Sequence, residues 1–398
     1  MLITAPRVIP AVPGAQILTP GWVEVRAGRV TAVAQGEPLR VPDVELPAGA
    51  LLPGLVDLQV NGYYGEEFQN VTADGWAAVA GRLPETGTTA FLPTFITAPP
   101  GALETALRAA SALIPHLPPG GARVLGVHAE GPFISPARKG AHNEAWITEP
   151  APAAVGQLLQ AGQGVLRLVT LAPERPGGLA AVARLSDAGV LVSVGPSDAT
   201  AQQVAGAADA GARMVTHLFN AQRPLHHREP GVVGAALTDP RLTSGLIGDL
   251  HHVSGLACVL AFSAAPSRIC LVTDAAACAG MPPGHYLLGG EAIELPPGDG
   301  EPPVRADGTL AGSALRMDVA VANMVASGIG LAGAVAAASR VPADLIGRPD
   351  IGRIAPGAAA DLAWLGDDLR TVASWVGGRL SWRKPGPDSA PVRDLPAW

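Results

Sequence analysis

The chain has 398 residues, of which 34 are acidic and 27 are basic, so its formal net charge is -7. That length allows two or three ordinary domains, or one barrel with an appendage. Hydrophobic residues make up 48% of the chain and charged residues only 15%, which excludes global disorder because such a chain can bury a large core. The mild acidity and the lack of Lys/Arg runs argue against nucleic acid or an anionic membrane as a partner.

The cysteines and the apolar runs bear on the compartment. Cys258, Cys270 and Cys278 are odd in number and form no CxxC pair, which favours a reducing cytoplasm over a disulfide framework. The opening MLITAPRVIP lacks a basic stretch followed by an apolar core, so we expect no signal peptide. The longest uncharged run, 319–339, is rich in Ala and Gly, which contribute little transfer energy. We therefore predict packed helices there, no membrane span and a cytoplasmic protein.

The first fifty residues read as short strands, and residues 23–25 and 29–34 form a hairpin pattern around a turn at 27–28. From residue 55 onward, short apolar runs alternate with Ala/Leu-rich stretches of helical spacing. Eight such units predict an α/β fold with a closed (β/α)8 TIM barrel. An open doubly wound sheet is the competing topology, but no GxGxxG follows the first strand. The eight expected strands are 55–60, 89–95, 124–129, 166–171, 190–194, 214–218, 244–248 and 269–273.

Short strands return after about residue 350, where 352–357 is turn chemistry and 360–365 reads as a strand. We expect both termini to pair into a small β-sandwich domain that the barrel interrupts. The predicted organisation is 1–52 for the N-terminal part of that domain, 53–349 for the (β/α)8 barrel, and 350–398 for the C-terminal part of the small domain.

Polar residues collect where the predicted strands end, which is the catalytic face of a barrel. Four of these strands end in His, Glu or Asp, and such groups are costly to bury unless they are paired or bound to a metal. The pattern therefore predicts a metal-assisted hydrolase site. The polar segments are 57–62, 128–133, 193–198, 216–221, 249–252 and 273–275.

Several motifs together resemble the N-acetylglucosamine-6-phosphate deacetylases of the amidohydrolase superfamily, and the resemblance covers nearly the whole chain. HxEGPF and THLFNA are specific to the deacetylase branch, whereas the opening motif and the tail at 352–362 are shared by many amidohydrolases. The motifs are LPGLVD at 52–57, HAEGPF at 128–133, THLFNA at 216–221, REPG at 228–231, LVTDA at 271–275 and LAGS at 310–313.

The resemblance implies a (β/α)8 barrel and one divalent metal ion per subunit, usually Zn2+. It implies hydrolysis of the acetamide of N-acetyl-D-glucosamine 6-phosphate to D-glucosamine 6-phosphate and acetate. It also implies a homodimer in which one subunit helps bind the phosphate of its neighbour.

The resemblance also assigns site residues. Glu130 and His217 match metal ligands, and Asp274 matches the aspartate that takes a proton from water and delivers it to the leaving amine. An alternative is that Asp274 caps a following helix, because Asp-Ala-Ala-Ala reads as an N-cap. His252 is also open to a second interpretation, as one of a surface pair of histidines. The residues matched to substrate binding are Ala141, His142, Asn220, Ala221, Arg228, His252, Leu310, Ala311 and Gly312.

Two features depart from the superfamily pattern. Gln59 and Asn61 stand where two metal-binding histidines often stand, as they do in a subset of these deacetylases taken to use one metal. Pro196 replaces an expected ligand histidine, and proline has no side-chain donor atom. Asp198 or His128 is a candidate substitute ligand, although a structural hydrogen bond is the simpler reading of His128.

Two alternative functions stay open. The chain resembles a deacetylase most, but an amidohydrolase for another acylated amine would use the same chemistry. A sugar-phosphate-binding barrel with weakened catalysis is the second alternative, because Pro196 removes an expected ligand.

Overall fold

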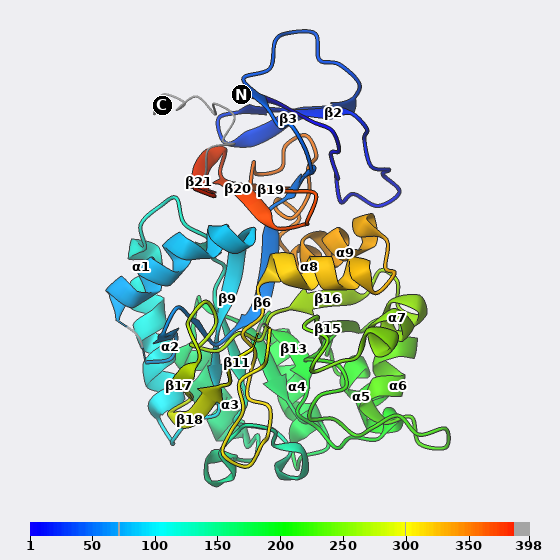
Figure 1. Ribbon diagram of the computed structural model, residues 1–398. Helices are drawn as coiled ribbons and strands as arrows, with labels where there is room; N and C mark the ends of the chain where they lie inside the picture. The colour runs from blue at the N-terminus through cyan, green and yellow to red at the C-terminus, as the bar shows by residue number, and fades with distance from the viewer. Residues whose placement is uncertain (71, 299, 386–398) are drawn as a thin grey trace.

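The structure is a computed structural model that describes residues 1–70, 72–298 and 300–385. A small β-domain lies above a larger barrel, and the N-terminus lies in the small domain (Figure 1). The barrel strands run parallel, and each pairs with the next barrel strand along the chain from β6 to β16. The confirmed barrel strands are β6 (Leu55–Val60), β9 (Thr88–Ile96), β11 (Val127–Glu130), β12 (Leu166–Leu171), β13 (Leu191–Val194), β14 (Met214–Val215), β15 (Thr243–Ile247) and β16 (Ile269–Val272).

The ring is closed between its first and last strands. β6 pairs with β9 on one side, and a parallel bridge from Val60 to Ala275 joins its end to the segment after β16. β14 ends at Val215, three residues earlier than expected, because His217 has a φ of 30° and the chain leaves the sheet there. The (β/α)8 prediction is confirmed, and the open sheet is excluded.

Helices surround the barrel, and several begin with clear N-terminal signals. Thr200 and Gln203 form a capping box at α5, and Thr72 caps α1. The run 319–339 forms α8 and α9, and no helix in the described ranges is long and apolar enough to cross a membrane. The helices are α1 (Ala73–Arg82), α2 (Ala102–Leu113), α3 (Pro152–Ala161), α4 (Gly178–Asp187), α5 (Ala201–Asp209), α6 (Gly231–Thr238), α7 (Gly255–Ala264), α8 (Met317–Ala326), α9 (Leu331–Ala338) and α10 (Arg340–Leu345).

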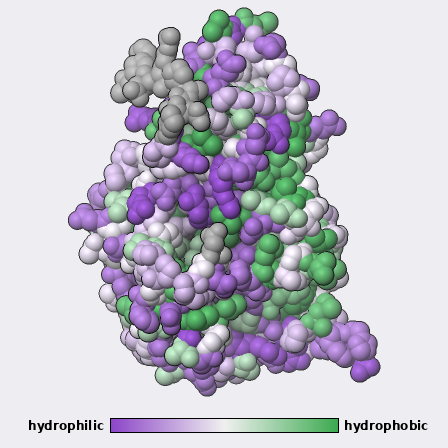
Figure 2. All heavy atoms as spheres, viewed as in Figure 1, coloured by the Kyte–Doolittle hydropathy of each residue, from purple (hydrophilic) through white to green (hydrophobic). Residues whose placement is uncertain are grey.

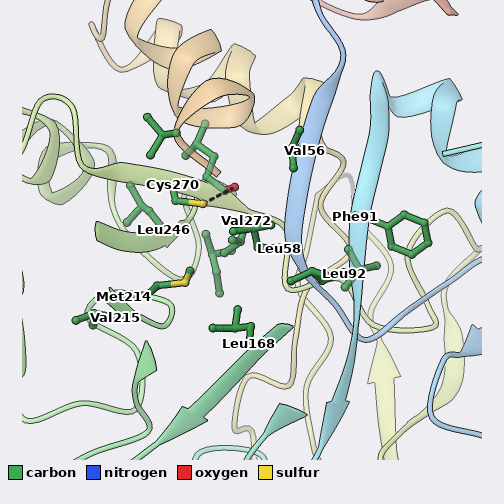
Figure 3. Packing of buried hydrophobic residues seen from close by; sticks show 14 of the residues in the cluster. Val56, Leu58, Phe91, Leu92, Leu168, Met214, Val215, Leu246, Cys270 and Val272 are labelled. Atoms are coloured by element: carbon green, nitrogen blue, oxygen red, sulfur yellow. Dashed lines mark hydrogen bonds between the residues drawn. The ribbon is translucent and has the colours of Figure 1, made fainter. Parts of the chain in front are cut away.

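The barrel core is built from strands that are buried along most or all of their length, as parallel strands covered by helices should be. Val56 and Leu58 of β6, Leu168 of β12 and Val272 of β16 gather in one cluster (Figure 3). Each of these side chains is fully buried, which contributes roughly 1.5–3 kcal/mol apiece before entropy is counted. This rigid ring positions the loops that follow the strands.

The small domain consists of two four-stranded sheets, one ordered β3-β2-β1-β4 and the other β21-β20-β19-β5. A separate apolar cluster that includes Ile3, Val23, Leu362 and Trp375 lies between them. The β2–β3 turn uses Ala27 and Gly28 with φ of 47° and 72°, as a two-residue hairpin requires. The strands are β1 (Leu2–Ala5), β2 (Gly21–Arg26), β3 (Arg29–Gln35), β4 (Val44–Glu45), β5 (Ala50–Pro53), β19 (Leu362–Leu365), β20 (Thr371–Val376) and β21 (Arg379–Arg383).

Both chain ends therefore contribute to the small domain, as expected. The boundaries at residues 52 and 349 stay a prediction, and residues 386–398 of the predicted C-terminal part lie outside the described residues. Asp361, which is 1% exposed, forms an ion pair with Arg123 at 2.9 Å, and its backbone carbonyl accepts from the N–H of Gly54. These bonds fasten the small domain to the barrel.

Short elements complete the fold. The hairpin of β17 (Gly284–Leu288) and β18 (Glu291–Leu295) lies in front of β11 and α3 in Figure 1. Its apolar side packs on Ile96, at the end of β9. The remaining elements are β7 (Gly62–Tyr63), β8 (Glu66–Glu67), β10 (Arg123–Val124) and the 3-10 helices Leu83–Thr86, Ile114–His116, Pro136–Arg138 and Glu144–Trp146.

Candidate active site

A cavity opens at the carboxyl ends of the barrel strands, the face where barrel enzymes place their chemistry. Its wall combines two carboxylates and three imidazoles with an apolar side. The lining residues are Asn61, Ile96, Glu130, Gly140, Ala141, His142, Pro196, His217, Asn220, Ala221, Ile247, His252, Asp274, Leu288, Thr309, Leu310 and Gly312.

Glu130 and His217 form a buried ion pair in this cavity. Glu130 is the last residue of β11, and its Oε1 lies 2.9 Å from Nε2 of His217. The other ring nitrogen of His217 lies 3.1 Å from the carbonyl of Asn220, which fixes the ring orientation. Burial opposes the charge on both groups, yet the bond and charge of Glu130 raise the pKa of His217 to about 9. The imidazoles of His142 and His217 hold the pKa of Glu130 well below its usual value against the effect of burial.

His142 approaches the same carboxylate from the loop after β11. Its Nε2 lies 3.8 Å from Oε1 of Glu130, and its Nδ1 lies 2.9 Å from the hydroxyl of Thr97. The side chain is buried, so this contact holds the ring at the wall of the cavity. The predicted substrate histidine is therefore next to the predicted metal ligands.

Asp274 follows β16 and completes the polar centre. Its Oδ1 accepts hydrogen bonds from Asn61 at 2.7 Å and from Gln59 at 2.9 Å. Burial, followed by the charge of Glu130, raises the pKa of Asp274 to about 6. In the described part of the chain the next helix, α8, begins only at Met317, so the helix-cap alternative is wrong.

The backbone around this centre is unusual. His217, Phe219, Ala221 and Asp274 all have positive φ, from 30° to 77°. Non-glycine residues rarely adopt such angles and keep them only where the surroundings enforce them, often at functional sites. Gln222 supplies part of that support, because its side chain accepts from the N–H of Phe219 and donates to the carbonyl of Thr216.

The residues proposed to replace the missing ligand are engaged elsewhere. Pro196 lines the cavity but offers no donor. Asp198 gives one carboxylate oxygen to Arg138 at 2.8 Å and the other to Arg223 at 2.7 Å. The ring nitrogens of His128 lie against Thr94 and Thr170, and burial lowers the pKa of His128 to about 4. The simpler, structural reading of His128 is the one that these contacts favour.

The donor set fits a divalent cation, with two strong protein ligands. Ligand atoms ~2.1 Å from a tetrahedral ion lie ~3.4 Å apart, and the 2.9 Å between Glu130 Oε1 and His217 Nε2 needs only a small opening. Two buried amide oxygens nearby, Gln59 Oε1 and Asn61 Oδ1, have no hydrogen-bond partner within the described residues. No three His, Cys, Asp or Glu side chains among residues 1–70, 72–298 and 300–385 form a ready metal group. Pro196 lines the same cavity and adds no donor atom to this set.

The predicted substrate residues divide into two groups. Seven of them line the cavity, namely Ala141, His142, Asn220, Ala221, His252, Leu310 and Gly312. His252 is fixed by Asp249, whose Oδ2 lies 2.6 Å from its Nδ1, and its side chain is only 5% exposed. The surface-pair alternative for His252 is therefore wrong. Ala311 is fully buried and is not part of the wall, and Arg228 is exposed on the hairpin before α6, away from the cavity.

Sequence reasoning missed the apolar side of the cavity. Ile96, Ile247 and Leu288 line it, and Leu288 comes from the β17–β18 hairpin, outside all of the motifs. Arg305 donates to the carbonyl of Ala141 at 2.6 Å, which ties the segment after this hairpin to the His142 loop. No local signal marks these residues, because an apolar residue at a strand end reads as core.

Comparisons with known proteins agree with the geometry. The Amidohydrolase family model matches residues 50–380, which is most of the chain. The chain therefore belongs to the amidohydrolase family. Within that family it is similar to the N-acetylgalactosamine-6-phosphate deacetylase of Escherichia coli O157:H7, at 39% identity over 366 residues that cover 91% of this chain and 96% of that protein. The human N-acetylglucosamine-6-phosphate deacetylase is 38% identical over 383 residues, which cover 90% of this chain and 91% of the relative.

Solved structures give the same relationship. N-acetyl-D-glucosamine-6-phosphate deacetylase from Mycobacterium smegmatis superposes with a TM-score of 0.89 at 36% identity, covering 96% of this chain and 99% of that one. The enzyme of the same name from Thermotoga maritima superposes with a TM-score of 0.86 at 30% identity, covering 96% and 100%. The family and the site together imply a divalent metal in the cavity.

Proposed function

We propose that this chain hydrolyses the acetamide of N-acetyl-D-glucosamine 6-phosphate to D-glucosamine 6-phosphate and acetate. The observation that carries the proposal is the buried Glu130–His217 pair beside Asp274 at the barrel mouth. The pair suits a cation and the aspartate suits proton transfer, which are the two requirements of amide hydrolysis. The relatives named as deacetylases of amino-sugar 6-phosphates supply the substrate class.

Glu130 and His217 would hold one divalent ion per subunit, and Zn2+ suits a carboxylate and an imidazole. A bound ion supplies Lewis-acid chemistry, because it polarises a carbonyl and makes water more acidic. Asp274 takes a proton from the attacking water and delivers it to the amine nitrogen as the C–N bond breaks. Its pKa of about 6 keeps the carboxylate ionised at neutral pH, so it can act as the base first.

The sugar would lie against the lining residues that the sequence singled out. Asn220 and Ala221 present an amide and a backbone group, and His142 and His252 present imidazoles. Asp249 orients His252 and holds its Nδ1, which leaves Nε2 for a carbonyl or a sugar hydroxyl. Leu310 and Gly312 form another part of the wall.

The phosphate would be bound between subunits of a homodimer. Arg228 is exposed on the short hairpin before α6 and is not among the residues that line the cavity of its own chain. Guanidinium grips phosphate oxygens in a bidentate manner, so this residue suits a neighbouring active site. Hydrophobic residues gather on the right-hand side of the face in Figure 2, where α7 carries Leu256 and Leu260 at 86% and 54% exposure. Such a patch supports association with a second copy.

The buried free thiols of Cys258, Cys270 and Cys278 are consistent with the cytoplasmic location that the sequence predicts.

The decisive experiment measures acetate release together with metal content. The purified protein should carry close to one equivalent of a divalent ion and should release acetate from N-acetylglucosamine 6-phosphate. The galactosamine epimer is the matched second substrate, because one relative is named for it. Faster turnover of the epimer would reassign the substrate, and acetate release from neither sugar phosphate would reject the proposal.

The phosphate assignment has its own test. Arg228→Ala should raise KM at least about tenfold with little change in kcat, because the phosphate is remote from the scissile amide and contributes uniform binding. N-Acetylglucosamine without the phosphate is the control substrate, and its kinetics should not respond to the substitution. Equal activity of the parent on the sugar with and without phosphate would contradict the assignment.

Pro196 supports a second candidate, a sugar-phosphate-binding barrel with weakened catalysis. The residue lines the cavity at a ligand position and provides no donor. Calorimetric binding of the sugar phosphate without acetate release, by protein that holds no metal, would favour this candidate.

A further inference from the structure

Two amide side chains converge on one oxygen of Asp274. Gln59 is near the end of β6 and Asn61 directly follows that strand, so the two side chains share a face of the extended segment. Asn61 donates from Nδ2 to Oδ1 of Asp274 at 2.7 Å, and Gln59 donates from Nε2 to the same oxygen at 2.9 Å. Because both donors occupy Oδ1, Oδ2 is left for a reacting proton.

Gln59 also bridges to the second carboxylate of the centre. Its Nε2 also donates to Oε2 of Glu130 at 3.2 Å, so the same amide nitrogen is hydrogen-bonded to both Glu130 and Asp274. Two buried carboxylates repel each other, and hydrogen bonds to the ionised form oppose that repulsion. The charged groups that act on Asp274 are Glu130, His217 and His252, and Gln59 and Asn61 add neutral donors to this set.

The backbone of the same segment holds Asp274 in place. The N–H of Asp274 donates to the carbonyl of Gln59 at 2.9 Å, and the N–H of Asn61 donates to the carbonyl of Ala275 at 2.8 Å. Asp274 has a φ of 52°, a left-handed conformation that needs such support. On the other side Gly312 approaches closely, because a Cβ there would lie 2.9 Å from the carbonyl oxygen of Asp274.

We propose that Gln59 and Asn61 are positioning residues for proton transfer by Asp274. The two amides fix Oδ1, so that Oδ2 faces the water and the amide nitrogen. They achieve with neutral N–H groups what a second cation would otherwise achieve at this end of β6. The inference deepens the proposed function and rests on it.

The test removes each donor without changing the volume greatly. Gln59→Leu and Asn61→Leu should each lower kcat about tenfold or more and leave KM within about threefold, because the loss falls on the transition state. The acid limb of the kcat/KM profile should move to higher pH, because donors to the ionised carboxylate are lost. Asn323→Leu is the matched control, since this amide donates to the carbonyl of Gly248 in the helical layer at 2.9 Å. It should leave both kcat and the acid limb unchanged.

The kinetics of Gln59→Glu and a crystal structure of Gln59→Leu provide two further tests. Gln59→Glu preserves the shape but adds a third carboxylate, and it should shift the acid limb further than Gln59→Leu does. A crystal structure of Gln59→Leu should show the Asp274 carboxylate rotated away from its position in the parent. An unmoved carboxylate, kcat within about twofold of the parent, or lower kcat with an unmoved acid limb would each overturn the proposal.

The two hypotheses fail in distinguishable ways. An inactive parent rejects the proposed function. An active parent with fully active variants rejects only the role of the amide pair.

Discussion

The mouth of the barrel and the small β-domain follow opposite rules of construction. Between the two sheets of the small domain lies an apolar cluster of residues such as Ile3 and Trp375, and the strands of each sheet pair in sequence. At the mouth, Glu130, His217 and Asp274 are buried together, although burying charged groups is costly. Positive φ angles gather at the mouth as well, at His217 and Asp274 among others.

The comparison shows that the apolar small domain stabilises the chain, whereas the polar mouth of the barrel provides the groups for chemistry. Buried charges and strained backbone destabilise a fold and persist where surrounding contacts enforce them. The apolar core of the small domain and the core of the barrel provide the stability that offsets this cost at the mouth. The contrast has an exception, because Trp375 in the sandwich has an indole N–H without a partner within the described residues, and nothing in the structure explains it.

The largest expected effect comes from the mouth. Asp274→Asn should lower kcat by about a hundredfold to ten-thousandfold, the usual range for a general acid–base group. The asparagine oxygen can still accept from Gln59 and Asn61, so thermal stability should not fall. Steady-state kinetics and a melting curve check both halves. A variant within a few-fold of the parent would remove Asp274 from the mechanism.

A substitution in the core of the small domain should lower stability and leave kcat nearly unchanged. Ile3 is completely buried, with 0% relative exposure. Ile3→Ala should therefore lower the free energy of unfolding by roughly 2–5 kcal/mol. The folded fraction should keep kcat within about twofold of the parent, because no charged group at the mouth is altered. Denaturant titration and kinetics on the same sample measure the two quantities. A loss of kcat equal to that of the Asp274 variant would break the comparison.

Pro196→His changes the mouth at the position where this chain departs from its apparent relatives. Proline holds φ near -65°, which histidine can adopt, and the carbonyl of Pro196 that accepts from Ser135 is kept. A third ligand should slow metal loss to a chelator by about tenfold or more, with higher activity at low metal. Metal analysis after dialysis is the measurement. Full retention by the parent and no gain in the variant would mean that another ligand is already present.

The smallest effect concerns Asp57, which is buried in the barrel below the mouth. Burial raises the pKa of Asp57 to about 7, although Thr273 donates to it. A raised carboxyl pKa stabilises the fold below the unfolded value and loses that contribution as the pH rises through about 7. Between pH 6 and 8 the parent should therefore lose about 1 kcal/mol more stability than Asp57→Asn does. Parallel pH-dependent melts of the two proteins would show equal slopes if this assignment is incorrect.

Much of the site was predictable from local sequence. The strings around Glu130, His217 and Asp274 lie at strand ends, and parallel strands of one barrel deliver their ends to one face. The same logic located Asn220 and His252. It did not reveal that Asp198 is held by Arg138 and Arg223, because that arrangement depends on loops that are distant along the chain.

The sequence by itself determined the barrel, the paired termini and the residue types at the mouth, because hydrophobic periodicity and strand-end motifs are local properties. Only the tertiary structure decided which partners meet. It joined Gln59 to both Glu130 and Asp274, placed Leu288 in the cavity wall, and left Arg228 outside it. These outcomes depend on ring closure and loop packing, in which contacts form between residues far apart along the chain, and no local pattern encodes such contacts.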